Sequence, residues 1–332
     1  MTTGWRWRGS IRDRVQEEGH DSNKPAFDPD WVQAKPASIK RSLDAALSRS
    51  GRGWFVLDAS ARISSRPRRF EVSGQELVAW RDGDQLRAAP AACPHMGASL
   101  EGAKLCGGRP VCPWHGLVLG PEGHGGWHHL PAYDDGVLSW IRLGEPAGEP
   151  GSDSAAERPT LPSRPEVFFA GVIRLEARCE PRDVLQNRLD PWHGAHFHPY
   201  SFGDLEVLED TPEKLVLRVE KRILGPLRVE VKAQFDCPDE RTIVMTILDG
   251  EGAGSTVETH ATPISQGRTA IVEATLATSA RPGFRFARRV APLVRPLLER
   301  SARRLWVDDA AYAERLFELR GRENPSSRGP SP

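Results

Sequence analysis

Two short segments that each combine one cysteine with one histidine place the strongest constraint on how this 332-residue chain folds. Cys93-Pro-His95 has the form Cys-x-His, and Cys112-Pro-Trp-His115, after residues 96–111, has the form Cys-x-x-His. A glycine closes each segment and allows the backbone to turn tightly there. Two thiols and two imidazoles on two neighbouring loops indicate a metal site.

A Rieske-type iron–sulfur cluster needs this donor set, because two thiolates bind one of its irons and two neutral imidazoles bind the other. Zinc fingers usually pair Cys with Cys and His with His on a ββα unit, whereas here each loop mixes the two. The spacing therefore favours a Rieske [2Fe–2S] cluster bound by Cys93, His95, Cys112 and His115 over a Cys₂His₂ zinc site or an accidental clustering.

The residues around these loops predict a small all-β domain. Short strand-like runs are separated by Gly, Ser and Asp turns, at Trp54–Leu57, Arg69–Val72, Glu76–Trp80 and Val137–Leu143. We expect this domain to span residues 46–145, after an N-terminal extension at residues 1–45 with one short helix over Ser38–Ser48. A segment rich in Gly, Pro, Glu and Ser follows and predicts a linker at residues 146–165.

The two loops resemble the two boxes of the Rieske family. Respiratory and photosynthetic members carry an additional, disulfide-bonded cysteine in each box, and Ala98 and Trp114 take these places here. The chain therefore resembles the oxygenase and ferredoxin branch. Cys106 lies between the boxes but outside the ligand pattern, and we interpret it as a small buried thiol.

A second constellation lies in Asp190-Pro-Trp-His193-Gly-Ala-His196-Phe-His198, which contains Asp-x₂-His-x₄-His. In a Rieske protein this pattern resembles the signature of the catalytic domain of Rieske non-haem iron oxygenases. Two histidines five residues apart lie on roughly one face of a helix and, with one carboxylate, complete the facial triad of non-haem Fe(II). The resemblance implies that His193 and His198 bind the iron, whereas His196 falls between the ligands.

The third ligand that the resemblance implies is an aspartate on a C-terminal helix, followed five residues later by glutamate. Asp308 and Asp309 compete for this role, and Asp309 is preferred because Glu314 stands at the matching offset. For either acid the alternative is a helix cap or a first-turn charge that favours the helix dipole.

The resemblance also implies roles for two residues that do not bind metal. Asp190 is expected to hydrogen-bond His193 of its own chain and one cluster histidine of a neighbouring chain, and Asn187 is expected near the iron. A head-to-tail interface of this kind repeats until it closes into a ring, so a homotrimer is implied.

The second half of the chain predicts an α+β catalytic domain at residues 166–320, with a helix-grip-like antiparallel sheet covered by helices. Strands are expected at Val167–Cys179, Leu215–Ile223, Leu227–Phe235, Thr242–Leu248, Ser255–Thr262 and Thr269–Thr278. A helical pattern runs from Gly283 to Leu319, broken at Pro292 and Pro296, and a disordered tail is expected at residues 321–332.

Composition limits the remaining choices. The 45 basic residues balance the 45 acidic ones, which gives no indication of a nucleic-acid partner. The first residues lack the apolar run of a signal peptide, and five cysteines without a disulfide pattern suit a reducing compartment, so a cytoplasmic protein is expected. The Arg-rich apolar stretch from Arg281 to Arg304 allows a weak membrane-surface contact or, alternatively, a solvated basic face.

These observations predict a terminal oxygenase that uses O₂ to hydroxylate or oxidatively demethylate a hydrophobic small molecule. The sequence holds no Gly-x-Gly-x-x-Gly dinucleotide fingerprint, so a separate NAD(P)H-dependent reductase, with or without a ferredoxin, is expected to supply electrons. The alternative is an electron-transfer or redox-sensing protein whose second domain binds a ligand without catalytic iron.

Overall fold

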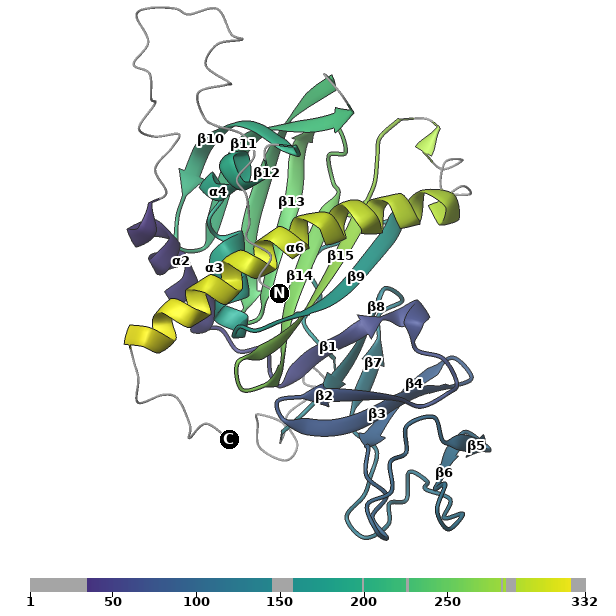
Figure 1. The fold of residues 1–332 in the computed structure, drawn as a ribbon. Helices are drawn as coiled ribbons and strands as arrows, with labels where there is room; N and C mark the ends of the chain where they lie inside the picture. The colour runs from purple at the N-terminus through teal and green to yellow at the C-terminus, as the bar shows by residue number, and fades with distance from the viewer. Residues whose placement is uncertain are drawn as a thin grey trace, which may run out of the picture.

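A computed structural model describes residues 35–144, 158–198, 200–224, 227–281, 283–284 and 291–323. The rest of the expected extension, linker and tail lies outside the described residues. The chain forms two bodies: a small β domain, at the lower right of Figure 1, and a larger domain in which one long helix crosses a curved sheet. The division into the predicted domain ranges stays a prediction.

The β domain consists of short antiparallel strands. They form two three-stranded sheets, β1-β8-β7 and β2-β3-β4, and one two-stranded sheet, β5-β6. The strands are β1 (Trp54–Ala59), β2 (Arg68–Val72), β3 (Gln75–Asp82), β4 (Gln85–Pro90), β5 (Lys104–Cys106), β6 (Arg109–Val111), β7 (Ala132–Asp134) and β8 (Leu138–Arg142), with the 3₁₀ turn η2 (Ser60–Arg62). The β5-β6 hairpin lies at the end of this domain that points away from the larger one (Figure 1).

The larger domain is built on a seven-stranded sheet in the order β10-β11-β12-β13-β14-β15-β9. Each neighbouring pair is antiparallel. The strands are β9 (Phe169–Ala177), β10 (Phe202–Asp210), β11 (Lys214–Leu224), β12 (Leu227–Asp239), β13 (Thr242–Gly250), β14 (Thr256–Ser265) and β15 (Arg268–Ala277). This arrangement confirms the predicted α+β class, although the sequence analysis missed the edge strand β10.

Helix α6 (Ala291–Glu323) lies across one face of this sheet, and the short helices α3 (Pro181–Arg188) and α4 (Trp192–Phe197) lie near it (Figure 1). The prediction that Pro292 and Pro296 break the helix was wrong, because α6 contains both residues. Proline removes one backbone hydrogen bond close to the helix start, whereas Ala302, Trp306 and Ala313 anchor the later turns in the core. The helix also continues to Glu323, past the expected start of the tail at residue 321. Among the described helices, none has the length and apolar content needed to cross a bilayer.

Helix α2 (Pro36–Leu47) belongs to the core of the larger domain, although it precedes the β domain in sequence. Its buried side chains Ile39, Leu43 and Ala46 join the same apolar cluster as Leu185 of α3 and Trp306 of α6. The residues before position 46 therefore contribute packing that the expectation of a polar extension did not include.

A buried ionic network joins the two domains beside an apolar contact. The Arg164 guanidinium donates to both carboxylate oxygens of Glu258, at 2.6 and 2.7 Å, and to Asp135 at 3.0 Å. Asp135 also accepts a hydrogen bond of 2.7 Å from the Trp140 indole. Burial alone would raise the pKa of both acids, but the hydrogen bonds and charge of Arg164, joined at Glu258 by those of His260, keep both pKa values below their ordinary range.

We expect Arg164→Met to lower the free energy of unfolding by about 3–5 kcal/mol, because it leaves two buried carboxylates without their counter-charge. Since the pKa of these acids is lowered in the folded state, their stabilisation is present near neutral pH and is lost as the pH falls through the carboxyl range. Chemical denaturation at neutral pH measures the difference. Arg268→Met, which breaks an exposed pair with Glu176, is the control and should cost less than about 1 kcal/mol. An equal effect of the two substitutions would contradict the role given to Arg164.

Candidate metal centres

The first candidate centre is formed by two loops of the β domain with matching backbone geometry. In the loop of Cys93, the Cys93 N–H donates to the Ala98 carbonyl and the Gly97 N–H donates to the Cys93 carbonyl, both at 2.8 Å. The loop of Cys112 repeats both bonds between the equivalent residues, at 2.8 and 3.0 Å. Gly97 adopts a φ of 76°, in the left-handed region that glycine enters without strain.

The four predicted cluster ligands meet at the ends of these loops. Cys93 and Cys112 are each 2% exposed, whereas His95 and His115 are exposed and their ring centroids lie 4.9 Å apart. Burial raises the pKa of the Cys93 thiol. At Cys112 burial acts in the same direction, but the backbone amides of Trp114 and His115 outweigh it and lower the pKa. Two thiols, two facing imidazoles and amides directed at a sulfur fit a Rieske cluster.

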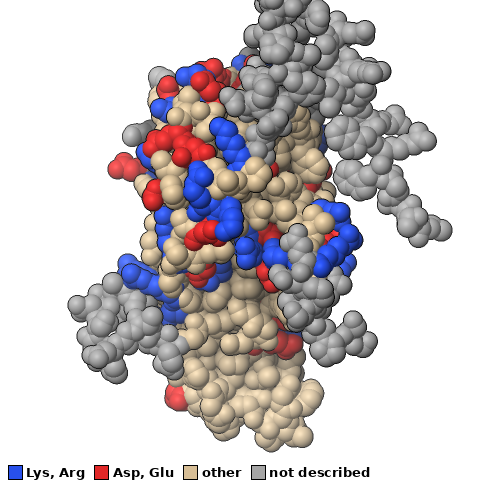
Figure 2. All heavy atoms as spheres, turned by 90° about the vertical axis from the view of Figure 1, so that its left-hand side faces the viewer, with Lys and Arg blue, Asp and Glu red and all other residues tan. Residues whose placement is uncertain are grey.

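The surface around this centre is apolar. Met96 is 64% exposed and Trp114 is 61% exposed, one on each loop. Figure 2 shows few charged side chains on this face of the β domain, at the bottom of the view, whereas the larger domain above it is densely charged. Cys106 is exposed, so the interpretation of this residue as a buried thiol was wrong; it lies at the end of β5, beside the turn of the β5-β6 hairpin.

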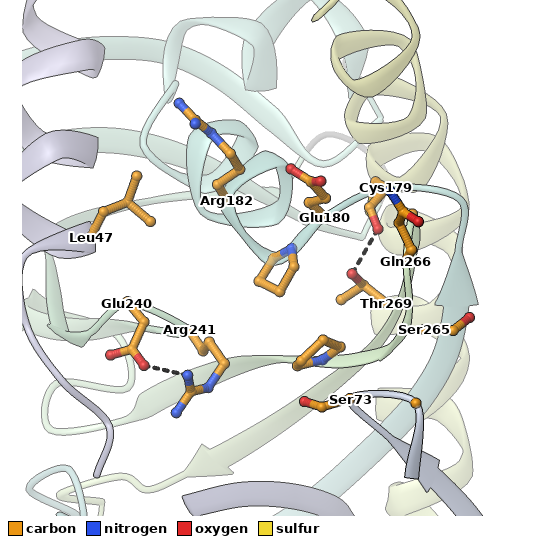
Figure 3. Close-up of a pocket in the computed structure, with 14 residues that line it drawn as sticks. Leu47, Ser73, Cys179, Glu180, Arg182, Glu240, Arg241, Ser265, Gln266 and Thr269 are labelled. Atoms are coloured by element: carbon orange, nitrogen blue, oxygen red, sulfur yellow. Dashed lines mark hydrogen bonds and ion pairs between the residues drawn. The ribbon is translucent and has the colours of Figure 1, made fainter. Parts of the chain in front are cut away.

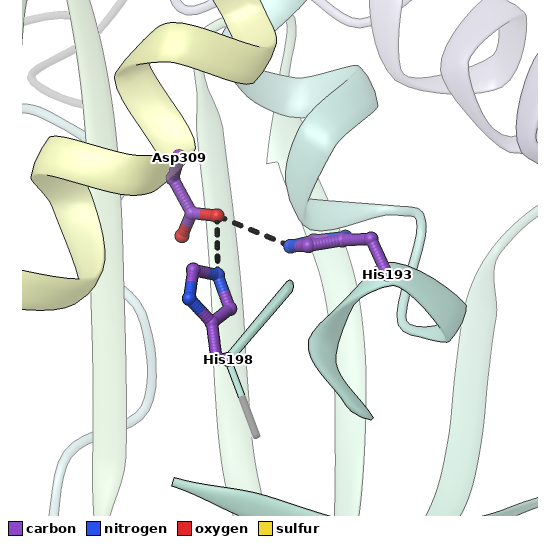
Figure 4. A group of neighbouring side chains, drawn as sticks. All are labelled: His193, His198 and Asp309. Carbon is purple, nitrogen blue, oxygen red and sulfur yellow. Dashed lines mark hydrogen bonds and ion pairs between the residues drawn. The ribbon is translucent and has the colours of Figure 1, made fainter. Parts of the chain in front are cut away.

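The second candidate centre brings together His193, His198 and Asp309 from two helices (Figure 4). His193 lies on α4, His198 caps its C-terminal end, and Asp309 lies on α6. Nε2 of His193 lies 3.1 Å and Nε2 of His198 lies 2.8 Å from Oδ1 of Asp309, and the three donor atoms all lie within 4.8 Å of one another. Two imidazoles and one carboxylate converging on one point fit the 2-His-1-carboxylate site of non-haem Fe(II).

The other ring nitrogens fix the orientation of both histidines. Nδ1 of His193 contacts the backbone carbonyl of Asp190, which can only accept a hydrogen bond, so Nδ1 is the donor and Nε2 is the ring nitrogen directed at the triad. Nδ1 of His198 lies 3.4 Å from the Tyr200 hydroxyl and 3.6 Å from Oδ2 of Asp308. The Tyr200 hydroxyl donates to Asp308 at 2.7 Å. Asp308 therefore lies behind His198, outside the triad, and Tyr200 is a neighbour of the site that the sequence analysis did not identify.

Asp309 is buried and held in its charged form. Burial raises the pKa of the carboxyl, but hydrogen bonds and charges of His193 and His198 outweigh it and hold the pKa well below its ordinary value. The Asn187 side-chain amide, itself fully buried, donates to Oδ1 of Asp309 at 3.1 Å. The structure thus places Asn187 directly beside the triad.

Only one of the two carboxylate oxygens of Asp190 accepts a hydrogen bond from the described residues. Its Oδ2 accepts a hydrogen bond of 3.0 Å from the Tyr312 hydroxyl, whereas its Oδ1 is buried without a hydrogen-bond partner among the described residues. Oδ2 lies 4.0 Å from Nδ1 of His193, so the short contact to this histidine runs through the backbone carbonyl. His196 is exposed and is not part of the triad.

A separate cavity of about 540 Å³ lies where α2, α3 and the β14-β15 hairpin meet the β2-β3 turn (Figure 3). Its lining includes Cys179, Arg182, Arg241 and Thr269. None of the predicted site residues lines it. We assign it no part in the two metal centres.

Comparisons with known proteins identify both halves of the chain. Residues 53–139 match the Rieske [2Fe-2S] domain, and residues 150–324 match a family described as a domain of unknown function, DUF5914. The oxygenase component of chloroacetanilide N-alkylformylase from Rhizorhabdus wittichii is 32% identical over 193 residues, which are 50% of this chain and 53% of that protein. The oxygenase component of 3-ketosteroid-9-alpha-monooxygenase from Rhodococcus rhodochrous is 32% identical over 178 residues, 48% of this chain and 44% of that protein.

Solved structures share the fold over most of the chain. Dicamba monooxygenase bound to dicamba superposes with a TM-score of 0.63 at 18% identity, covering 86% of this chain and 92% of that one. The oxygenase of carbazole 1,9a-dioxygenase, in complex with ferredoxin, gives a TM-score of 0.55 at 14% identity, with 90% of each chain covered. The matched segments span about half the length of the relatives found by sequence.

Proposed function

We propose that this chain, which belongs to the DUF5914 family and carries a Rieske [2Fe–2S] domain ahead of it, is the terminal oxygenase of a multicomponent system that hydroxylates or oxidatively demethylates an apolar small molecule. One observation carries the proposal: the triad of His193, His198 and Asp309 occurs in the same chain as a Rieske domain. An electron-transfer or sensing protein has no need of a buried facial triad.

The two metal centres have different tasks. When bound, the cluster supplies single electrons and the mononuclear iron supplies the chemistry that activates O₂. We assign the cluster to Cys93, Cys112 and the two exposed histidines of the same loops, and the iron to the triad. The residues behind the triad hold it in place: Asn187 donates to the Asp309 carboxylate, and the Asp190 carbonyl accepts from Nδ1 of His193 and so directs Nε2 at the metal position.

Electron transfer between subunits is supported by the positions of the centres. The cluster loops and α4 lie at opposite ends of the molecule (Figure 1). Oδ1 of Asp190 has no hydrogen-bond partner among the described residues, and His95 and His115 both have exposed rings, each with a nitrogen that can donate. We therefore propose a homotrimer in which the Asp190 carboxylate meets His95 or His115 of the partner subunit.

Two partners follow from the chemistry. The proposed reaction consumes electrons, and relatives of this chain are named as oxygenase components, one of them solved with a ferredoxin. We therefore propose a separate NAD(P)H-dependent reductase, acting directly or through a ferredoxin.

Anaerobic quantification of iron and acid-labile sulfide, with EPR of the reduced protein, tests the proposal. An oxygenase of this kind should hold about three irons and two sulfides per chain, whereas an electron-transfer protein should hold about two of each. A chain that is saturated with cluster but binds no third iron after reconstitution would favour the electron-transfer alternative.

Asp190→Asn should lower turnover by about 10- to 100-fold while the cluster stays reducible and the oligomer stays assembled. The amide keeps the size of the side chain but loses the negative charge that couples the two imidazoles. Steady-state oxygen consumption, EPR and sedimentation measure the three properties. Unchanged turnover would remove Asp190 from the electron path.

Mixed oligomers provide the complementary control. Chains that lack the cluster (Cys112→Ser) and chains that lack the iron (His193→Ala) should regain part of the activity when they assemble together, since an intact cluster on one chain then serves an intact iron on the next. If particles shown to be mixed stay inactive, electrons travel within one chain.

A further inference from the structure

Strand β11 places a lysine among apolar side chains. Lys221 stands opposite Phe202 of β10 and Val229 of β12. Directly opposed residues of antiparallel strands project from the same face. Phe202 and Val229 both pack against the apolar cluster of Leu215, Leu217, Val219, Val231 and Ala233, so Lys221 projects from the face that carries this cluster.

This face is the one on which the iron triad lies. The ring of Phe202 packs near the ring of His198, with centroids 6.3 Å apart. Phe235 packs against both the apolar cluster and the core beneath α6, so the two share one side of the sheet. Lys221 is therefore separated from an iron ligand by one aromatic side chain.

Lys221 is an exposed cation that stands beside apolar side chains. The residue keeps exposed surface, yet desolvation by the surrounding protein lowers the pKa of its ammonium group, with the charge of Glu273 acting in the opposite direction. Glu220, its neighbour in sequence, projects from the other face and pairs with Arg228. Among the described side chains, no carboxylate lies within the 4.0 Å of an ion pair with Lys221.

Helix α6 adds apolar surface on the same side. Leu293 is 77% exposed and Leu297 is 64% exposed. Both share a helical stripe with Arg304, because separations of seven and eleven residues return to nearly the same direction. The Arg304 guanidinium lies 3.9 Å from the centroid of the Tyr200 ring, which borders His198. Arg304 therefore borders the site through Tyr200, and the stripe continues from it as exposed leucines toward the start of α6.

From these contacts we infer that the substrate is an apolar molecule with one carboxylate group, and that Lys221 is the residue that binds the carboxylate. Phe202 and Val229, the partly buried apolar residues opposite Lys221, take the hydrocarbon part. A single unpaired ammonium group beside this surface selects a single negative charge, since burying a charge without a partner is unfavourable. The inference rests on the proposed oxygenase function, because it concerns the substrate of that site.

Equilibrium binding of 2-naphthoate and of its uncharged counterpart 2-naphthamide, measured by calorimetry without reductant, tests the inference. The wild-type protein should bind the acid at least about tenfold more tightly than the amide, as expected for a charge-assisted hydrogen bond. Lys221→Met should abolish this preference, and Lys221→Arg should retain most of it. Lys232→Met removes a lysine from the opposite face of the same sheet and should leave the preference unchanged.

Equal binding of acid and amide by the wild type, a preference that survives Lys221→Met, or no binding of the acid at millimolar concentration would each overturn the inference. The iron and sulfide contents of every variant are measured alongside and should equal those of the wild type. A protein that lacks the third iron but still shows a Lys221-dependent preference would contradict the oxygenase function and leave the carboxylate site intact, so the two failures are distinguishable.

Discussion

Cys112→Ser should abolish the visible absorption of the oxidised protein and the rhombic EPR signal of the reduced protein. A serine hydroxyl is not ionised near neutral pH and cannot replace the thiolate that holds one iron of the cluster. The Cys112 sulfur is buried and receives backbone amides, so no exposed group is positioned to take over as ligand. Absorption spectra, EPR and acid-labile sulfide measure a loss that we expect to be complete, and turnover should disappear with it.

Cys106→Ser is a matched control, because it makes the same chemical change in the same domain at an exposed position outside the ligand pattern. Its spectra should equal those of the wild type. Intact cluster spectra in Cys112→Ser, or their loss in Cys106→Ser, would refute the assignment of the cluster ligands.

His193→Ala and His198→Ala should each remove the mononuclear iron and all turnover. Each substitution leaves only two of the three donors of the facial triad, too few to hold Fe(II). The cluster lies at the other end of the molecule and should keep its spectrum. Iron quantification should fall from about three to about two irons per chain in both variants. Retention of the third iron in either variant would contradict the ligand set.

His196→Ala controls for the loss of any histidine from this segment. His196 lies between the two proposed ligands in sequence but is exposed and outside the triad. The variant should keep both metals and most of its activity. If it alone lost the iron, the assignment of His193 and His198 would be wrong.

The order of the domains and the fold class could be predicted because their signals are local. The Rieske boxes hold their donors within a few residues, and alternating apolar residues mark most strands of the sheet. Strand β10 was missed because it is an edge strand with two register shifts, so its alternation is short and irregular. The continuity of α6 was not predicted. Proline in a helix interior usually breaks or kinks the helix, but Pro296 lies close to the start of α6 and is contained in it.

The environment of the triad depends on contacts between distant segments, which no local pattern reports. In the sequence, only the offset to Glu314 distinguished Asp309 from Asp308. In the structure a helix directs neighbouring side chains to different sides, so Asp309 contacts both histidines whereas Asp308 contacts Tyr200. Tyr200 carries no motif and matters only because α6 brings Asp308 to it. The same holds for Lys221, whose apolar neighbours lie on the two adjacent strands, β10 and β12.

Helix α2 also governs how this protein can be divided and in what order it folds. Its core partners in α3 and α6 follow the entire Rieske domain in sequence, so the Rieske domain is an insertion between two parts of one core. During synthesis the Rieske domain can fold first. The apolar face of α2 stays uncovered until its partners in α3 and α6 have left the ribosome. A fragment limited to residues 150–324 would lack Ile39, Leu43 and Ala46 and would expose the surface that they cover. Such a fragment should aggregate or bind chaperones unless a peptide of residues 35–48 is supplied in trans.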